Sequence, residues 1–154
     1  IADEEIRRRI DRAININEVC DVNPFGVEAL IAAYNESESW LKELLTYLYD
    51  NYLFLCRFFE KRLPRFPIMH LEGTYLVWVD CSTLGLHSKE IAAQLLSHQK
   101  LWLNEGGMYG EAGDKFIRIN IACPRATLKD ALLRLAAEWG EQKELPCRNS
   151  PTGK

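Results

Sequence analysis

A single arginine lies within an otherwise apolar stretch of the chain, directly after a glycine-rich loop. From residue 116 to residue 123 the sequence reads Phe-Ile-Arg-Ile-Asn-Ile-Ala-Cys. Successive side chains of a β-strand point to opposite faces, so the isoleucines share one face and Arg118 lies on the other. A guanidinium in the middle of an apolar strand is costly unless an anion meets it. We therefore expect an anionic partner for Arg118.

Two kinds of anion fit this arginine, and the residues leave the choice open. The planar guanidinium has five N–H donors and suits a carboxylate that accepts two parallel hydrogen bonds. The loop from Gly106 to Gly113 contains four glycines, which let the backbone approach a ligand closely. The carboxylate of a ligand is one candidate partner. An internal Asp or Glu is the other.

Three segments of the chain resemble the C-terminal part of fold-type-I pyridoxal-phosphate enzymes, the aspartate aminotransferase superfamily. They are Asn23-Pro24-Phe25-Gly26-Val27-Glu28-Ala29-Leu30, Glu72-Gly73-Thr74-Tyr75 and Arg118-Ile119-Asn120-Ile121-Ala122-Cys123-Pro124-Arg125. Within the superfamily they are similar to the MalY/PatB-like C–S lyases, the cystathionine β-lyase branch, over nearly all of residues 1–142. The resemblance implies a lyase that acts on sulfur amino acids. An aminotransferase of the same superfamily stays open as an alternative.

The resemblance also implies roles for individual residues. The family grips the α-carboxylate of its amino-acid substrate with an arginine at the position of Arg118. The loop before this strand lines the substrate pocket, which places Met108 and Tyr109 near the ligand. Asn23 falls in a segment that the family's dimers bring near the partner's active site. The expected substrate-binding residues are thus Arg118, Tyr109, Met108 and Asn23, and a homodimer is expected.

The cofactor-binding residues of the family lie upstream of the region that this chain resembles. Family members hold pyridoxal phosphate through a Schiff-base lysine, an aspartate and a phosphate-binding turn. The lysines of this chain are Lys42, Lys61, Lys89, Lys100, Lys115, Lys129, Lys143 and Lys154. Each is predicted on a helix surface, in a loop or in the tail, where no amine is buried for covalent chemistry. The chain begins at Ile1, so we expect the C-terminal portion of a longer enzyme, inactive alone and without bound cofactor.

Composition excludes several other classes of protein. The 154 residues are 47% hydrophobic and 27% charged, as in ordinary folded domains. The net charge of -3 and the scattered basic residues give no footprint for nucleic acid or an anionic membrane. No apolar run approaches the roughly 20 residues that span a bilayer. The five cysteines and three histidines have no metal-ligand spacing, and the cysteines indicate reduced thiols in a cytoplasmic protein.

Helical and strand patterns alternate along the chain, which predicts an α/β domain with a small mixed or antiparallel sheet and helices packed on one face. Asp3 is the expected cap of the first helix, and Asn35 with Glu38 that of a long interdomain helix. Ser88 is the expected cap of a helix with Ile91, Leu95 and Leu96 inward, and Thr127 with Asp130 forms a capping box for the last helix. The expected strands are residues 74–80, 101–104 and 116–123.

Three parts of the chain follow from these elements. Residues 1–45 are predicted to be a helical remnant of the large cofactor-binding domain together with the start of the linking helix. Residues 46–141 are predicted to form the small C-terminal α/β domain. Residues 142–154 contain two prolines and no periodicity, which predicts a flexible tail.

Overall fold

The computed structural model describes residues 3–16 and 23–140, and the predicted tail at residues 142–154 lies outside the described residues. The chain separates into two units, Ile1–Leu44 and Leu45–Lys154. The assignment of the first unit to a remnant of a cofactor-binding domain stays a prediction.

The described residues of the first unit, 3–16 and 23–44, are helical and include no buried residue. Helix α1 (Glu4–Asn15) begins where predicted, because the Asp3 carboxylate accepts a hydrogen bond of 2.8 Å from the Ile6 N–H. Helix α2 (Pro24–Glu36) starts with a proline, whose fixed φ suits the first helical position. Neither helix has a buried residue. Their apolar side chains are therefore left without a partner within the described part of this unit.

The predicted long helix is α3 (Glu38–Arg62), with 25 residues, but it does not have the predicted cap. Asn35 is still helical within α2, so it cannot adopt the extended geometry that a capping residue needs. The helix breaks at Ser37, whose carbonyl accepts the Leu41 N–H at 3.0 Å. The prediction of an Asn35 cap is therefore wrong by two residues.

The second unit is built on a three-stranded antiparallel sheet with the strand order β1-β3-β2. Its strands are β1 (Leu76–Asp80), β2 (Asn104–Glu105) and β3 (Phe116–Asn120). The antiparallel arrangement was one of the two predicted, but every strand is shorter than its apolar stretch. The ladder between strands sets these limits, because only residues with a hydrogen-bonded partner extend the sheet.

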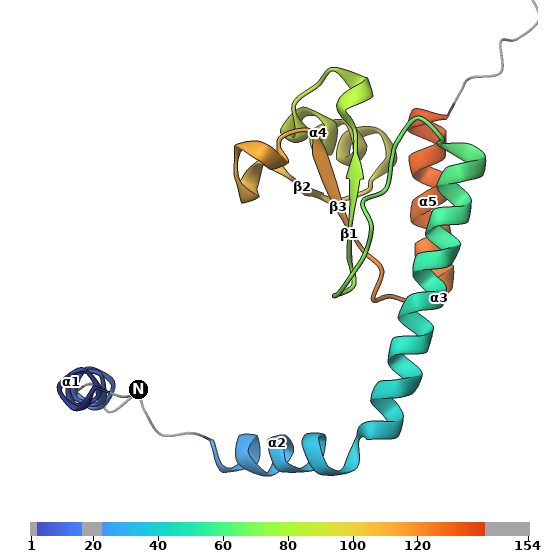
Figure 1. The fold of residues 1–154 in the computed structure, drawn as a ribbon. Helices are drawn as coiled ribbons and strands as arrows, with labels where there is room; N and C mark the ends of the chain where they lie inside the picture. The colour runs from blue at the N-terminus through green and yellow to red at the C-terminus, as the bar shows by residue number, and fades with distance from the viewer. Residues whose placement is uncertain (1–2, 17–22, 141–154) are drawn as a thin grey trace, which may run out of the picture. The chain divides into compact units, whose positions relative to one another are not determined.

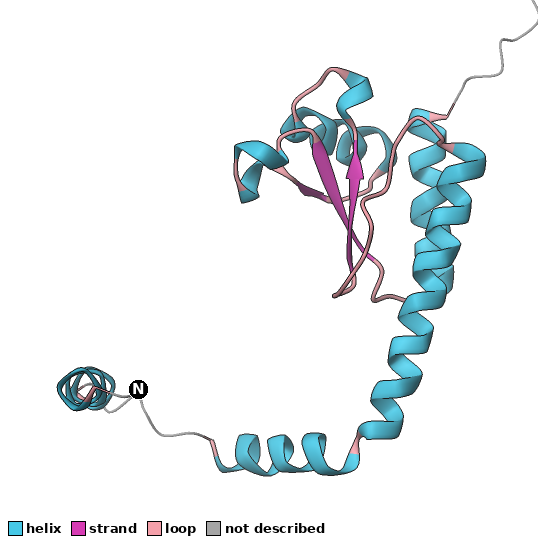
Figure 2. Cartoon of the chain, viewed as in Figure 1, coloured by secondary structure: helices cyan, strands magenta, loops and turns pink. Residues whose placement is uncertain are grey.

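Helices cover one face of this sheet and leave the other open (Figures 1 and 2). Val77 opposes Ile119 and Val79 opposes Ile117 across the ladder, and all four side chains are buried. Residues from α3, α4 (Ser88–Gln99) and α5 (Arg125–Trp139) complete this core. The helical members are Leu55, Phe59, Ile91, Leu95, Leu128, Leu132, Leu135 and Trp139. The prediction of helices packed on one face is confirmed.

Three details of α4 and α5 differ from the prediction. His87, not Ser88, is the N-terminal cap residue of α4, and Ser88 is fully buried as the first helical residue. Leu96 is 48% exposed, because it lies about 100° around the helix from the buried Leu95. Helix α5 begins at Arg125, directly after Pro124. The expected capping box at residues 127–130 therefore lies inside the helix.

One buried polar side chain joins α3 to the connection between β3 and α5. Asn51 is fully buried, and its amide nitrogen donates to the carbonyls of Ile121 at 2.9 Å and Cys123 at 3.0 Å. Its amide oxygen accepts from Arg125 Nε at 2.6 Å. This residue holds the end of β3 against α3.

None of the helices in the described ranges combines the length and apolarity that a bilayer crossing requires.

Candidate functional site

Arg118 lies at the centre of the open face of the sheet. It is on the middle strand β3, with Trp78 of β1 opposite it on one side and Asn104 of β2 on the other. The side chain is half-buried, and its neighbours Ile117 and Ile119 point into the core. The alternation predicted for this strand is therefore confirmed, and it directs the guanidinium away from the helices.

An aromatic ring lies against the guanidinium. Arg118 Cζ is 4.6 Å from the centre of the Tyr109 ring, a cation–π distance. The ring of Trp78 meets that of Tyr109 edge-on, with centres 5.4 Å apart and planes at 84°. Asn104 Nδ2 donates to the Tyr109 hydroxyl at 3.3 Å. Tyr109 is thus held from two sides while it orients Arg118.

Arg118 has no anionic partner in the described part of the chain. No ion pair or hydrogen bond of its side chain forms with any residue in the ranges 3–16 and 23–140. A ring contact leaves the N–H donors of the guanidinium unused. The internal alternative, an Asp or Glu of this chain, therefore finds no candidate among the described residues.

The glycine loop places Tyr109 by closing on itself. Gly106 donates its N–H to the Phe116 carbonyl at 2.8 Å, and two short 3-10 helices, Gly107–Tyr109 and Glu111–Gly113, complete the turn. A Cβ atom on Gly106 would lie 2.1 Å from the Gly113 carbonyl oxygen. Only glycine permits this approach of two backbones. The glycines were predicted to let the backbone approach a ligand. In the structure, Gly106 lets two parts of the loop backbone pack against each other.

The other two predicted site residues are Met108, next to α4, and Asn23, in the first unit. Met108 is 63% exposed and lines a hollow with Leu96 and Trp102, next to α4. Asn23 lies in the first unit, where its side chain accepts a 2.9 Å hydrogen bond from the Phe25 N–H and so caps α2. The contact of either residue with a ligand stays a prediction.

Sequence reasoning missed Trp78 and Asn104 as neighbours of Arg118. They are 40 and 14 residues away from it in the chain, so only the pairing of strands brings them together. The available signal was the alternation of side chains along a strand. Val77 and Val79 share the face that is buried, so Trp78 between them lies on the opposite face. Beside Arg118 and Asn104, next to the residues 101–103 that precede β2, the surface is hollowed by about 420 Å³.

The described lysines do not provide a site for pyridoxal phosphate. Five of the six are exposed, and the half-buried Lys115 donates to the Leu86 carbonyl at 3.1 Å. Lys42 lies 2.7 Å from Glu38 on the surface of α3. A lysine that forms a Schiff base has to be desolvated or placed beside another cation. The residues described here do not fit the cofactor, and they also contain no group of three His, Cys, Asp or Glu side chains that could hold a metal.

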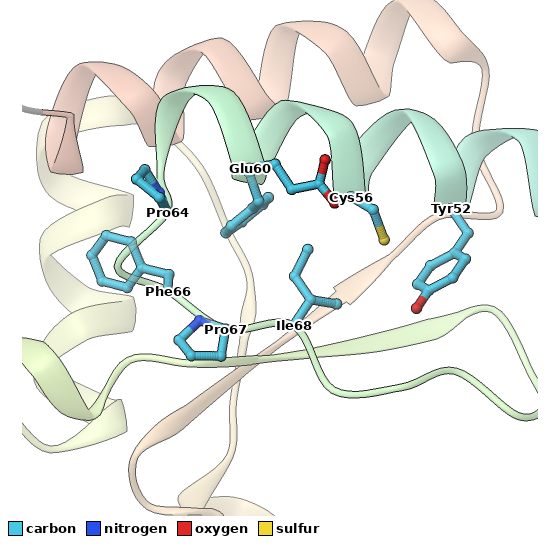
Figure 3. A pocket seen from close by; sticks show the side chains of 8 residues that line it. Tyr52, Cys56, Glu60, Pro64, Phe66, Pro67 and Ile68 are labelled. Carbon is cyan, nitrogen blue, oxygen red and sulfur yellow. The ribbon is translucent and has the colours of Figure 1, made fainter.

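A second hollow, of about 400 Å³, lies beside α3 (Figure 3). Tyr52, Cys56 and Glu60 reach it from the helix, and Phe66 and Ile68 from the segment that follows. Burial raises the pKa of the Cys56 thiol above its ordinary value. A protonated thiol is a poor nucleophile, so this hollow offers no activated cysteine.

Comparison with known proteins gives a consistent result. The chain is 35% identical to the cystathionine β-lyase PatB of Bacillus subtilis over 137 residues, 89% of this chain and 35% of that protein. It is 32% identical to protein MalY of Escherichia coli over 110 residues, 71% of this chain and 28% of that protein. It spans about a third of the length of these curated relatives.

A solved structure has the same fold. The pyridoxal-phosphate-bound C–S lyase of Staphylococcus hominis, complexed with L-cycloserine, matches with a TM-score of 0.77 at 32% identity. The match covers 89% of this chain and 33% of the lyase. No family model matches the chain.

The antiparallel sheet, the helices on one of its faces and these matches define a region of the fold-type-I pyridoxal-phosphate enzymes. The chain belongs to this superfamily, aminotransferase class I/II. Within it, the chain corresponds to a C-terminal region of the MalY/PatB-type cystathionine β-lyase branch.

Proposed function

We propose that this chain is part of a pyridoxal-phosphate-dependent C–S β-lyase that acts on sulfur amino acids, and that Arg118 binds the α-carboxylate of the substrate. The observation that carries the proposal is a half-buried guanidinium, stacked on Tyr109, that has no carboxylate partner within the described ranges. A bidentate arginine–carboxylate pair holds an amino acid in one orientation. That orientation fixes the Cα–H bond relative to the groups that act on it.

The cofactor belongs to another part of the proposed enzyme, because the described lysines do not fit it. Pyridoxal phosphate supplies the electron sink for cleavage of the C–S bond. This chain supplies the carboxylate-binding wall of the site. By itself it is expected to be inactive.

Lyase chemistry is favoured over transamination, because the relatives include a cystathionine β-lyase and a C–S lyase. A homodimer in the cytoplasm completes the proposal. The family resemblance supports the dimer. The described cysteines Cys56, Cys81 and Cys123 are free thiols, which supports a reducing compartment.

The replacement Arg118→Ala in the full-length lyase, loaded with its cofactor, tests the carboxylate role. We expect kcat/KM for L-cystathionine to fall by about 30-fold to 900-fold, which corresponds to about 2 to 4 kcal/mol of transition-state stabilisation. The matched control is Arg134→Ala, which removes an arginine that pairs with Asp130 on α5. This control should leave kcat/KM nearly unchanged.

A decarboxylated analogue of the substrate sharpens the test. Without an α-carboxylate it has nothing for Arg118 to bind, so Arg118→Ala should change its turnover little. An equal loss for the analogue and for L-cystathionine would show that Arg118 has another role.

The isolated chain can be tested separately for cofactor binding. Pyridoxal phosphate is added, imines are trapped with borohydride, and the intact mass is measured. We expect no adduct at a single lysine. Stoichiometric labelling of one lysine would show that the chain contains a cofactor site after all.

A further inference from the structure

A buried serine fastens the glycine loop to helix α4. Ser88 is 0% exposed, and its Oγ accepts a hydrogen bond of 2.9 Å from the Gly107 N–H. The same oxygen lies 3.3 Å from Asp114 Oδ1 and 3.4 Å from Glu105 Oε2. A hydroxyl has one proton, so it donates to one of these carboxylates while it accepts from Gly107. Both hydrogen bonds of this hydroxyl are therefore made with the glycine loop or with the residues that flank it.

Asp114 holds the other end of the loop at the same place. Its carbonyl accepts the Ser88 N–H at 2.8 Å, and its carboxylate is hydrogen-bonded to His87 Nδ1. That hydrogen bond lowers the pKa of the Asp114 carboxyl, which keeps it ionised as an acceptor for Ser88. Both ends of the glycine loop are thus fixed to the first turn of α4.

The Ser88 contact lies two residues from the ring that stacks on Arg118. Gly107 starts the short 3-10 helix that ends at Tyr109, and the Tyr109 N–H donates to the Gly106 carbonyl at 3.0 Å. This turn is short and is closed by that hydrogen bond. A shift of Gly107 should therefore move the Tyr109 ring and change its contact with the guanidinium 4.6 Å away.

We propose that Ser88 is a positioning residue for Arg118. Its hydroxyl anchors Gly107 and thereby keeps the Tyr109 ring against the guanidinium that receives the substrate. The importance of this role for catalysis rests on the proposed function of Arg118, whereas the structural coupling does not.

Nuclear magnetic resonance on the chain tests the coupling directly. A guanidinium against an aromatic ring has its Hε and Hδ resonances displaced by the ring current. In Ser88→Ala we expect Arg118 to lose most of this displacement, and the Gly107 amide to exchange faster with solvent. Ser88→Thr retains the hydroxyl and should restore both signals. Ser97→Ala is the matched control, because Ser97 lies on the same helix and its hydroxyl donates to the Gln94 carbonyl within that helix.

Ser88→Cys covers the case in which Ser88→Ala fails to fold. Cysteine fills the same space but accepts hydrogen bonds weakly. It should therefore change the Arg118 chemical shifts, as Ser88→Ala does, while the core remains packed. If folded Ser88→Ala or Ser88→Cys leaves the Arg118 resonances where they are in the wild type, the proposal is overturned.

Kinetics of the full-length, cofactor-loaded lyase separate positioning from a merely structural role. We expect Ser88→Ala to raise KM for L-cystathionine about 5-fold to 10-fold with kcat nearly constant, and Ser88→Thr to restore it. A fall in kcat with unchanged KM would overturn the positioning role.

The two proposals can fail independently. Arg118 chemical shifts that change in Ser88→Ala, together with an Arg118→Ala enzyme of normal activity, would support the coupling and refute the proposed function. Arg118 chemical shifts that stay at their wild-type values in Ser88→Ala, together with an inactive Arg118→Ala enzyme, would do the reverse.

Discussion

The two faces of β3 differ in what their side chains do. On one face Ile117 is fully buried and Ile119 is 3% exposed, and both belong to the core beneath the helices. On the other face Phe116 and Arg118 are half-buried and lie against the aromatic rings of Trp78 and Tyr109. Adjacent residues of one strand thus belong to the core and to the open face, where Arg118 is proposed to bind the substrate carboxylate. Stability and ligand recognition should therefore respond to different substitutions only one residue apart.

The core face should give the largest effect. Ile117→Ala removes a fully buried side chain and leaves a cavity, so we expect the free energy of unfolding to fall by about 3 to 4 kcal/mol. Urea denaturation followed by circular dichroism measures this change.

Arg118→Ala is the matched substitution on the neighbouring residue. It removes one ring contact and should cost no more than about 1 kcal/mol of stability. Similar losses from Ile117→Ala and Arg118→Ala would mean that the two faces do not divide the roles in this way.

Asn51, like Ser88, is a fully buried polar residue, and its loss should have the next largest effect. Asn51→Ala leaves the carbonyls of Ile121 and Cys123 without their side-chain donor, at a position where Asn51 itself is fully buried. We expect the free energy of unfolding to fall by about 2 to 3 kcal/mol in urea denaturation. Asn104→Ala on the open face loses a single 3.3 Å bond to Tyr109 and should cost less than about 1 kcal/mol. The reverse order would refute the comparison.

Tyr109 should have a smaller effect, confined to the open face. Tyr109→Leu removes the ring from Arg118 and should cost about 0.5 to 1 kcal/mol of stability, whereas Tyr109→Phe keeps the ring and should cost less. A double-mutant cycle with Arg118→Ala isolates the ring–guanidinium energy. A coupling energy of zero would mean that the stacking contributes nothing in solution.

The local features of this molecule could be predicted from sequence because they depend on near neighbours. The period-two pattern of β3 predicted the direction of Arg118, and Asp3 predicted the start of α1. Alternating helical and strand patterns predicted a mixed or antiparallel sheet, and a helical pattern predicted the long helix. Each of these depends on residues that are close together in the chain.

Contacts between residues far apart in the chain could not be predicted in this way. Ser88 matched the pattern of a helix cap, but its side chain bonds to Gly107, 19 residues away. Asn51 bonds to the Ile121 carbonyl 70 residues away, and nothing in its helical surroundings indicates this. The predicted strand limits were wrong for the same reason. Residues 101–103 before β2 are apolar, but only Asn104 and Glu105 pair with β3.

The smallest expected effect is a pH dependence at the rim of the core face. Glu138 of α5 accepts hydrogen bonds from His98 Nδ1 at 2.8 Å and from Gln99 Nε2 at 2.9 Å, which join α5 to α4. The bond from His98, more than that from Gln99, lowers the pKa of the Glu138 carboxyl in the folded chain. Its contribution to stability is therefore fully present above the ordinary value of 4.5 and is lost as the pH falls through the lowered pKa.

Glu138→Gln should flatten the fall of Tm below pH 4.5, measured by thermal denaturation at a series of pH values. Glu43→Gln, at an exposed carboxylate of α3, is the control and should leave the curve unchanged. Asp114 on the loop side also has a lowered pKa, caused first by its hydrogen bond from His87, and its contribution has the same sign. If Glu138→Gln retains the full pH dependence of Tm while Asp114→Asn removes it, the acid sensitivity lies in the loop that positions Tyr109. In that case the open face would lose its structure at low pH before the core does.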